Sequence, residues 1–239
     1  MKDVGEFDKR NIEFDSVFNR DIIIKNSVTS KTPIVFDIGA HHGQSIDYLK
    51  TIFPGCKIYS FEPDPESFKV LSRKESDRVE VFNIAISNQV GEVRFFKNKI
   101  SHTNSLYKIN LDSNDSIRAT KERSLEKSAY SDEINREIRV KSTTLSKFID
   151  DHGISHIDLI KIDVQGAEDK VLEGANLSII SSIIVEVSFY DFYEKSTSFM
   201  DIEKILTPAG FYLFSILDIS RNPMNGRTDW VEVLYKRMS

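Results

Sequence analysis

The sequence predicts an α/β protein with a Rossmann-like fold, in which helices cover both faces of a mostly parallel, seven-stranded sheet. Three observations support this prediction. Residues 33–53 run from a continuous apolar stretch through two glycines into an amphipathic pattern, which is typical of a strand, a tight loop and a helix. Strand-like and helix-like segments then alternate along much of the chain. The last two strand-like segments, 211–217 and 230–236, are separated only by a polar loop, which predicts an antiparallel pair at the sheet edge.

The individual elements follow from apolar runs, alternation and turn residues. Asp64 and Pro65 are a favourable cap and first-turn pair for a helix, and Gly153 is a good signal for the end of another. Segment 92–96 alternates and follows a turn, so we expect it to extend the third strand as a hairpin. The predicted strands are 33–38, 57–61, 79–85, 92–96, 137–141, 157–163, 182–187, 211–217 and 230–236. The first predicted helix ends near residue 53, and the others cover 64–74, 144–152, 168–175 and 198–206.

Two segments stand apart from this regular pattern. Residues 1–32 are polar with scattered apolar positions, and we expect a helical extension that packs on the edge of the domain or on a partner, with a homodimer as one option. Residues 33–239 then form the main domain. Within it, segment 108–137 is rich in charged and small polar residues, which predicts either a lid or a helical insertion with a solvated face.

The composition narrows the class of protein. Hydrophobic residues make up 40% of the chain, charged residues 29%, and the net charge is −5, so nucleic acid is not the expected partner. The single cysteine, Cys56, excludes an internal disulfide framework and suits a reducing compartment. The chain has no apolar run of transmembrane length, and its first residues lack the pattern of a signal peptide. We therefore expect a cytoplasmic protein with no transmembrane segment.

Candidate cofactor contacts follow the first three predicted strands. The loop at Gly39 is expected to aim backbone N–H groups at a ligand, and Glu62 is placed to accept both hydroxyl hydrogens of a ribose. Asp37 would face the amino end of a zwitterionic ligand, and residues after the third strand would form a slot for a purine. In chain order these contacts match the methionine tail, ribose and adenine of S-adenosylmethionine (SAM). The predicted cofactor-binding residues are Asp37, Gly39, Ala40, His41, Gly43, Ser45, Glu62, Pro63, Asn83, Ala85, Ile86 and Asp163.

Each of these motifs also has a simpler interpretation. A glycine turn after a strand is often only a tight turn, and Glu62 before Pro63 can be an ordinary helix-capping acid. The predicted C-terminal hairpin adds weight to the cofactor interpretation, because the class I SAM methyltransferase fold ends its sheet in the same way.

Four motifs of the chain resemble those of the FkbM-type methyltransferases. The resemblance covers residues 33–190, and its most distinctive motif ends in Asp163, Gln165 and Glu168. Gln165 stands where the family commonly has an acid, and His41-His42 stands where it carries little charge. The resemblance implies SAM-dependent methylation of a hydroxyl on a sugar, a glycan or a secondary metabolite. The four motifs are Val35-Phe36-Asp37-Ile38-Gly39-Ala40 with Gly43, Phe61-Glu62-Pro63, Asn83-Ile84-Ala85-Ile86-Ser87 with Gly91, and Ile160-Lys161-Ile162-Asp163-Val164-Gln165-Gly166-Ala167-Glu168.

Three residues are candidates for catalysis of methyl transfer. A hydroxyl is a poor nucleophile until a base removes its proton, and Asp163, at the end of its strand, is the first candidate. Glu186 is expected nearby and would share this role, or the two acids would bind Mg²⁺. Asp163 can instead be a helix cap or a contact to the cofactor's amino group. His102 is the alternative base. The histidines lack metal-ligand spacing, so no dedicated metal centre is expected.

Two other functions remain open at this point. A nicotinamide-dependent oxidoreductase would use a related sheet, but the loop between Gly39 and Gly43 departs from the glycine pattern that such enzymes need. A non-catalytic SAM-binding protein would keep the cofactor site without turnover. The acids Asp37, Glu62 and Asp163 favour an active enzyme.

Overall fold

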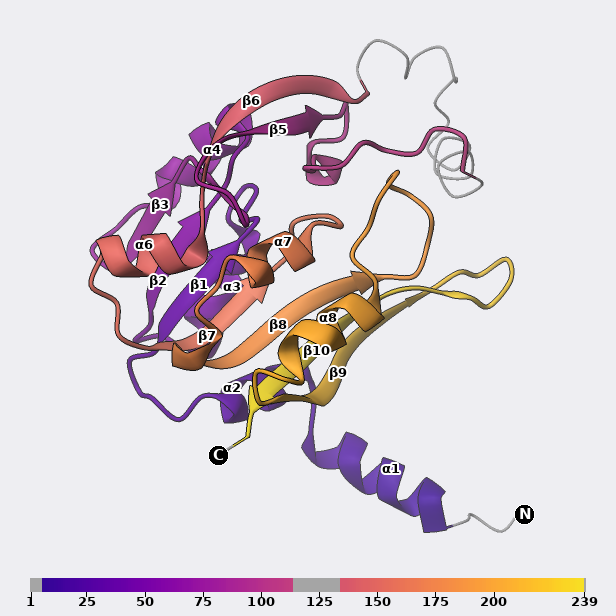
Figure 1. Ribbon diagram of the computed structural model, residues 1–239. Coiled ribbons are helices and arrows are strands. Elements are labelled where there is room, and N and C mark those ends of the chain that lie inside the picture. The colour runs from indigo at the N-terminus through magenta and orange to yellow at the C-terminus, as the bar shows by residue number, and fades with distance from the viewer. Residues whose placement is uncertain (1–5, 114–133, 239) are drawn as a thin grey trace.

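The computed structural model describes residues 6–113 and 134–238, and its centre is a seven-stranded sheet (Figure 1). The strand order is β3-β2-β1-β7-β8-β10-β9. All neighbours from β3 to β8 are parallel, whereas β10 is antiparallel to both β8 and β9. The predicted sheet with its antiparallel C-terminal hairpin is therefore confirmed. The strands are β1 (Ile34–Ile38), β2 (Lys57–Phe61), β3 (Val79–Phe82), β7 (Ile157–Ile162), β8 (Ile180–Ser188), β9 (Phe211–Arg221) and β10 (Thr228–Arg237).

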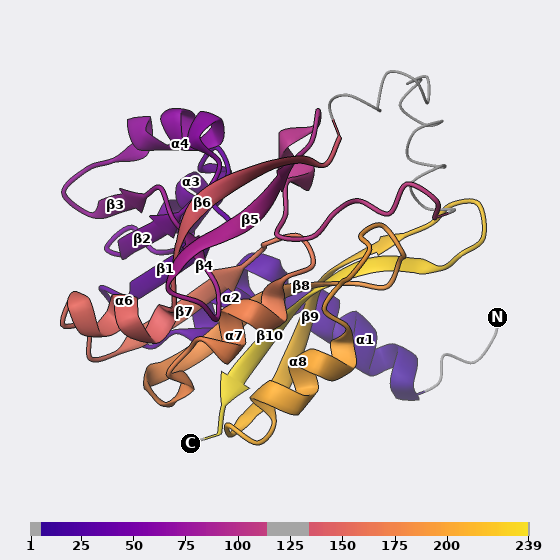
Figure 2. The same cartoon turned by 45° about the horizontal axis from the view of Figure 1, so that its top comes forward.

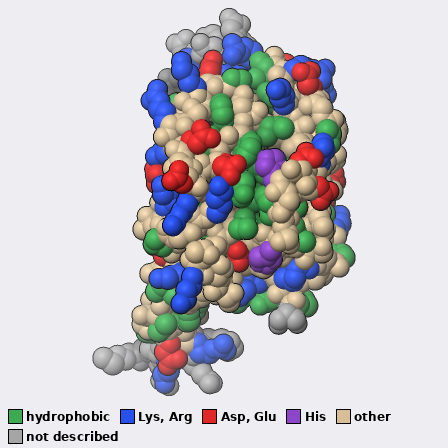
Figure 3. Space-filling view, turned by 90° about the vertical axis from the view of Figure 1, so that its left-hand side faces the viewer, with side chains coloured by type: hydrophobic (Ala, Val, Ile, Leu, Met, Phe, Trp, Pro, Cys, Tyr) green, Lys and Arg blue, Asp and Glu red, His purple; other side chains and the backbone are tan. Residues whose placement is uncertain are grey.

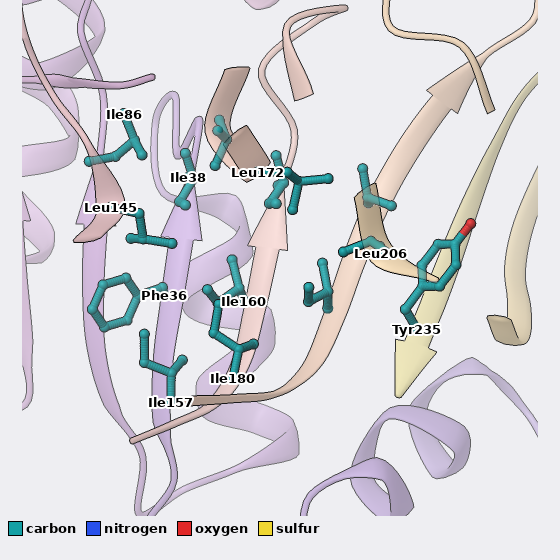
Figure 4. Close-up of a cluster of buried hydrophobic side chains, with 14 of the residues drawn as sticks. Phe36, Ile38, Ile86, Leu145, Ile157, Ile160, Leu172, Ile180, Leu206 and Tyr235 are labelled. Carbon is teal, nitrogen blue, oxygen red and sulfur yellow. The ribbon is translucent and has the colours of Figure 1, made fainter. Parts of the chain in front are cut away.

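Helices cover the two faces of this sheet and bury a separate apolar core on each. Helices α6 (Leu145–Asp151), α7 (Glu168–Glu173) and α8 (Phe199–Leu206) lie on one face. Alternate residues of the strands, such as Phe36 and Ile160, point toward them (Figure 4). Helices α2 (Arg20–Ser27), α3 (Gln44–Ile52) and α4 (Pro65–Leu71) lie on the other face, over Val35 and Leu159. Strands buried on both sides explain the continuous apolar runs in the sequence.

The N-terminal residues form two helices with different surroundings. Helix α2 buries Ile23 and Ile24 in the core beside α3. Helix α1 (Glu6–Val17) extends away from the body of the molecule in both ribbon views (Figures 1 and 2). Short 3-10 helices occur at Ser72–Lys74, Ser101–Thr103 and Leu177–Ile179, and the second of these is called η2 below.

A second, three-stranded sheet lies above the carboxyl ends of the parallel strands (Figure 2). Its strands show that the predictions for segments 79–85 and 92–96 are wrong. It contains β4 (Ala85–Ile86), β5 (Gly91–Lys97) and β6 (Arg136–Thr143), in the order β4-β6-β5. The prediction of a single strand over 79–85 is wrong, because β3 ends at Phe82. The Asn83 side chain donates hydrogen bonds to the carbonyls of Glu62 and Pro63 at the point where the chain leaves the main sheet.

The prediction that 92–96 extends the third strand as a hairpin is also wrong. Strand β5 pairs antiparallel with β6, from Gly91 opposite Ser142 to Lys97 opposite Arg136. Alternation showed that 92–96 is a strand, but its partner lies some forty residues further along the chain and is not encoded by local pattern.

The predicted lid or insertion, 108–137, falls largely on residues 114–133, which lie outside the described residues. Its described ends meet through Asn135, whose side chain accepts a hydrogen bond from the Ile109 N–H and donates one to the Ile109 carbonyl.

The charges on the surface and the lengths of the helices are relevant to two kinds of partner, nucleic acid and membranes. Acidic and basic side chains are interspersed on the face shown in Figure 3, with a band of hydrophobic side chains between them, and the residues coloured there form no broad area of one charge. Over residues 6–113 and 134–238, no helix combines the length and the apolar character needed to cross a bilayer.

Candidate active site

A cavity of about 510 Å³ lies at the carboxyl ends of β1, β2 and β7, between the main sheet and the small sheet. This is the sheet edge at which open α/β folds bind their ligands. The cavity unites residues from elements far apart in the sequence. Of the residues predicted from the sequence, Gly39, Ala40, His41, Ser45, Glu62, Pro63, Ala85, Ile86, His102 and Asp163 line it. Within the described part of the chain, the predicted residues Asp37, Gly43, Asn83 and Glu186 lie outside the lining.

The loop after β1 holds the chain against both neighbouring strands. The N–H groups of Gly39 and Ala40 both donate to the carbonyl of Phe61, at 3.0 Å. Gly39 has φ +87°, and a Cβ placed on it would lie 1.9 Å from the Asp163 carbonyl oxygen. Only glycine permits this backbone to approach β7 so closely. Gly43 has φ +83° and precedes α3, so its role is to start that helix.

Glu62 lines the cavity just after β2 and is held by two backbone groups. The His41 N–H donates to one carboxylate oxygen at 2.9 Å, and the Asp64 N–H donates to the other at 2.8 Å. Burial raises the pKa of Glu62 to about 7, even though these two hydrogen bonds favour the charged form. Each carboxylate oxygen can accept a further hydrogen bond, so Glu62 retains acceptor capacity toward a ligand.

One end of the cavity is apolar. Ile84, Ala85 and Ile86 enter it from the bend after β3, and Phe95 enters from β5. The small sheet therefore supplies part of this apolar end, where a slot for a purine was predicted, since both β4 and β5 belong to it. Asn83, which was expected in this slot, instead fixes the bend through the carbonyls of Glu62 and Pro63.

The other end of the cavity is charged. Lys161 and Asp163 line it, and the Lys161 ammonium lies 2.9 Å from an Asp163 oxygen. Beneath them lies Asp37, which is fully buried and faces Lys161 across the β1–β7 pairing. Ser45 donates a hydrogen bond to Asp37 Oδ2, whereas Oδ1 has no partner among the described residues. Burial raises the pKa of Asp37, and Lys161 opposes that rise. Asp37 therefore supports the cavity from below and does not reach the ligand space directly.

Comparison with known proteins assigns the chain to a family. A family model described as "Methyltransferase FkbM domain" matches residues 37–213. The chain belongs to the FkbM methyltransferase family. Among curated proteins, it is 28% identical over 220 residues to methyltransferase sdnD of Sordaria araneosa, covering 83% of this chain and 77% of that protein. It is also 28% identical over 166 residues to 2-O-methyltransferase NoeI of Sinorhizobium fredii (strain NBRC 101917 / NGR234), covering 68% of this chain and 66% of that protein.

A solved structure shares the fold. The crystal structure of methyltransferase FkbM from Methylobacillus flagellatus KT superposes with a TM-score of 0.50 at 16% identity, over 87% of this chain. At this low identity the likeness concerns the fold alone, and the present chain spans 44% of that protein.

In this FkbM methyltransferase, Asp163 is held by neighbours on both oxygens. Oδ2 accepts from Lys161 and Oδ1 accepts from the Gln165 side chain at 2.8 Å. Burial alone would raise the pKa of Asp163, but Lys161 and Gln165 outweigh it and the pKa lies below its ordinary value. Gln165 has φ +58°, and its side-chain oxygen accepts from the buried Tyr193 hydroxyl at 3.1 Å. The Gln165 amide thus gives Asp163 a donor where an acid would repel it.

The other two candidates for catalysis differ in position. His102 lies in η2 and lines the cavity. Glu186 lies on β8 outside the lining, where burial and the negative charge of Asp163 raise its pKa to about 8. Over the described ranges, no group of three histidine, cysteine or acidic side chains is arranged to hold a metal ion, so the Mg²⁺ hypothesis gains no support from the geometry.

The sequence reasoning missed several residues of the cavity. Lys161 had a visible signal, because a lysine inside an otherwise apolar strand requires a buried partner. Gln165 was noticed only as a departure from the family pattern. Arg20 and Tyr48 line the charged end from α2 and α3, and no sequence signal connected them with the loop after β1.

Proposed function

We propose that this protein is an O-methyltransferase, which uses SAM to methylate a hydroxyl group of a sugar, a glycan or a secondary metabolite. The observation that carries the proposal is one cavity whose lining changes from apolar, through the Glu62 carboxylate, to the charged pair Lys161 and Asp163. Adenine, ribose and a zwitterionic methionine tail require the same order of chemical groups. The description of NoeI as a 2-O-methyltransferase supports oxygen as the atom methylated.

The cavity residues divide between the parts of SAM. Ile84, Ile86 and Phe95 would hold the adenine by apolar contact, and Glu62 would accept hydrogen bonds from the ribose hydroxyls. The narrow loop at Gly39 would admit the sulfur and the tail beside Asp163. When bound, SAM supplies an electrophilic methyl group. The protein's part is to align an acceptor oxygen with that methyl and to take up the hydroxyl proton.

His102 is the stronger candidate for the base once the surroundings of Asp163 are considered. Both Asp163 oxygens already accept hydrogen bonds, and its pKa is below the ordinary value, so it is a weak base. A lowered pKa suits a carboxylate that binds a cation, such as the α-ammonium of SAM. His102 lines the same cavity, and an imidazole is the side chain that most often serves as a general base.

The roles of His102 and Asp163 are tested by two variants. We expect His102→Ala to lower kcat by about 10²-fold with little change in SAM affinity, because a positioned base contributes about that factor. Asp163→Asn, by contrast, is expected to weaken SAM binding, because it removes a negative charge from the end of the cavity proposed to hold the methionine tail. Steady-state kinetics and calorimetry separate the two effects. A kcat loss confined to Asp163→Asn would return the role of base to Asp163.

Affinity for the cofactor should depend on pH through Glu62. The ionised carboxylate accepts the ribose hydrogen bonds, so affinity for S-adenosylhomocysteine should fall as pH drops through about 7, the pKa of Glu62. Glu62→Gln should bind weakly and remove this dependence near that pH. The effect of Glu62 on the free energy of unfolding has the opposite dependence on pH. Because folding raises the pKa of this acid, the folded state holds the proton more tightly than the unfolded state, and Glu62 favours unfolding increasingly as pH rises from 4.5 toward 7. Calorimetry over a pH series checks the affinity.

The function itself is tested with the purified full chain. Transfer of a labelled methyl group from SAM to members of a panel of sugars, glycans and hydroxylated metabolites, with mass spectrometry to locate the methyl, would support the proposal. Binding of NAD in place of SAM would overturn it. Binding of SAM without transfer to any hydroxyl compound would favour a cofactor-binding protein instead.

A further inference from the structure

The charged end of the cavity contains an arginine that comes from outside the matched family region. Arg20 is the first residue of α2, and the family model begins to match only at residue 37. Arg20 nevertheless lines the same cavity as Glu62 and Asp163. Helix α2 brings it there by packing Ile23 and Ile24 into the core beside α3.

The Arg20 guanidinium is fixed in place, yet it keeps hydrogen-bond donors for a ligand. Its Nε and Nη2 donate to the same Glu232 oxygen, at 2.9 and 2.7 Å, and its centre lies 4.5 Å from the middle of the Tyr48 ring. In residues 6–113 and 134–238, Nη1 has no hydrogen-bond partner. The side chain is 30% exposed. A guanidinium held in this way loses little further entropy when it binds a carboxylate.

The order of strands indicates which part of SAM would reach Arg20. Glu62 follows β2, Gly39 follows β1 and Asp163 follows β7, and these three strands are successive neighbours in the sheet. If adenine and ribose occupy the apolar end and Glu62, the amino-acid tail extends past Gly39 toward β7. The tail has two charges, an α-ammonium and an α-carboxylate.

The charges at this end suit such a zwitterion. Asp163 is an acceptor for an ammonium group, while the Lys161 ammonium is already engaged by Asp163 and lies next to the buried Asp37. Among the described residues that line the cavity, Arg20 is the other arginine or lysine besides Lys161. A strongly anionic acceptor group such as a phosphate would fit less well, because Glu232 lies beside the guanidinium.

We propose that Arg20 binds the α-carboxylate of the methionine tail of SAM, which makes helix α2 part of the cofactor site. The inference rests on the proposed use of SAM. Its consequence is that the chain before the matched region is required for cofactor affinity.

The test compares two nucleosides that differ only at the tail. S-adenosylhomocysteine carries the amino-acid tail, whereas methylthioadenosine has the same adenine, ribose and sulfur without it. Their dissociation constants are measured by calorimetry at pH 8, where Glu62 is largely ionised, for the parent protein, Arg20→Gln and Arg20→Gln/Glu232→Gln. The double variant removes both members of the ion pair, so that no unpaired Glu232 remains. Arg139→Gln, at an exposed position on β6 outside the cavity, is the matched control.

We expect both Arg20 variants to weaken S-adenosylhomocysteine by about 10- to 100-fold, the range of a charge-assisted hydrogen bond, and methylthioadenosine by less than about twofold. Arg139→Gln should change neither. Equal losses for the two nucleosides, or no loss for either, would overturn the assignment of Arg20. An unchanged affinity for S-adenosylhomocysteine with a raised KM for the hydroxyl compound would assign Arg20 to the acceptor. If the parent protein binds neither nucleoside, the proposed use of SAM fails, and not merely the role of Arg20.

Discussion

Replacing Gly39 with alanine is expected to destabilise the protein by about 4 kcal/mol or more, a loss at the extreme of single substitutions. The added Cβ would lie 1.9 Å from the Asp163 carbonyl oxygen, which is backbone and cannot rotate away. The φ of +87° adds a further cost for a residue with a side chain. Relief requires β1 and β7 to separate at their carboxyl ends, where the Asp163 N–H donates to the Ile38 carbonyl at 2.9 Å. Folded protein that does form should bind SAM weakly.

Gly153 provides the matched control for this prediction. It also has a left-handed φ, +63°, but a Cβ there would meet nothing within 4 Å. Gly153→Ala should therefore cost only the conformational part, about 1–2 kcal/mol. The two variants are compared by urea denaturation. A free energy of unfolding for Gly39→Ala within about 1 kcal/mol of that for Gly153→Ala would mean that the close approach to β7 is easily relaxed.

Replacing Lys161 with methionine is expected to destabilise the protein by about 3 kcal/mol, because it leaves the buried Asp37 carboxylate and the half-buried Asp163 carboxylate without their cation. Asp37 is fully buried and faces Lys161 across the β1–β7 pairing, and Asp163 lies 2.9 Å from the ammonium. Without Lys161, Asp37 must either stay charged in an apolar setting or take up a proton. The pKa of Asp37 would rise further, so the variant should lose stability as pH rises above the ordinary pKa of an aspartate.

Two further variants separate this charge effect from loss of packing. Lys161→Met combined with Asp37→Asn removes the stranded charge and should recover part of the lost stability at neutral pH. Lys57→Met removes a lysine from a surface ion pair with Glu80, in which the two side chains are 32% and 40% exposed, and should cost less than about 1 kcal/mol. Free energies of unfolding from urea titrations at several pH values check both expectations. No recovery in the double variant would assign the loss to the packing of the Lys161 methylenes.

Glu62 and Asp37 show which parts of the cavity could be predicted from the sequence. Glu62 was placed correctly in the cavity because a residue immediately after a parallel strand must lie at the carboxyl edge of the sheet. Asp37 was expected to face the ligand by the same logic, but it is still within β1, where alternation buries its side chain toward α3. One residue along a strand decides between lining the cavity and supporting its floor.

By itself the sequence determined the parts of this protein that depend on neighbouring residues. Apolar runs, glycine turns and helix signals specified the strands of the main sheet, the loop at Gly39 and the acid at Glu62, because such features arise within a few residues of one another. Tertiary structure alone decided the pairing of β5 with β6, the engagement of Asp163 by Lys161 and Gln165, and the arrival of Arg20 in the cavity. These depend on which distant segments bury one another's surfaces, and that choice is made by the packing of the whole chain.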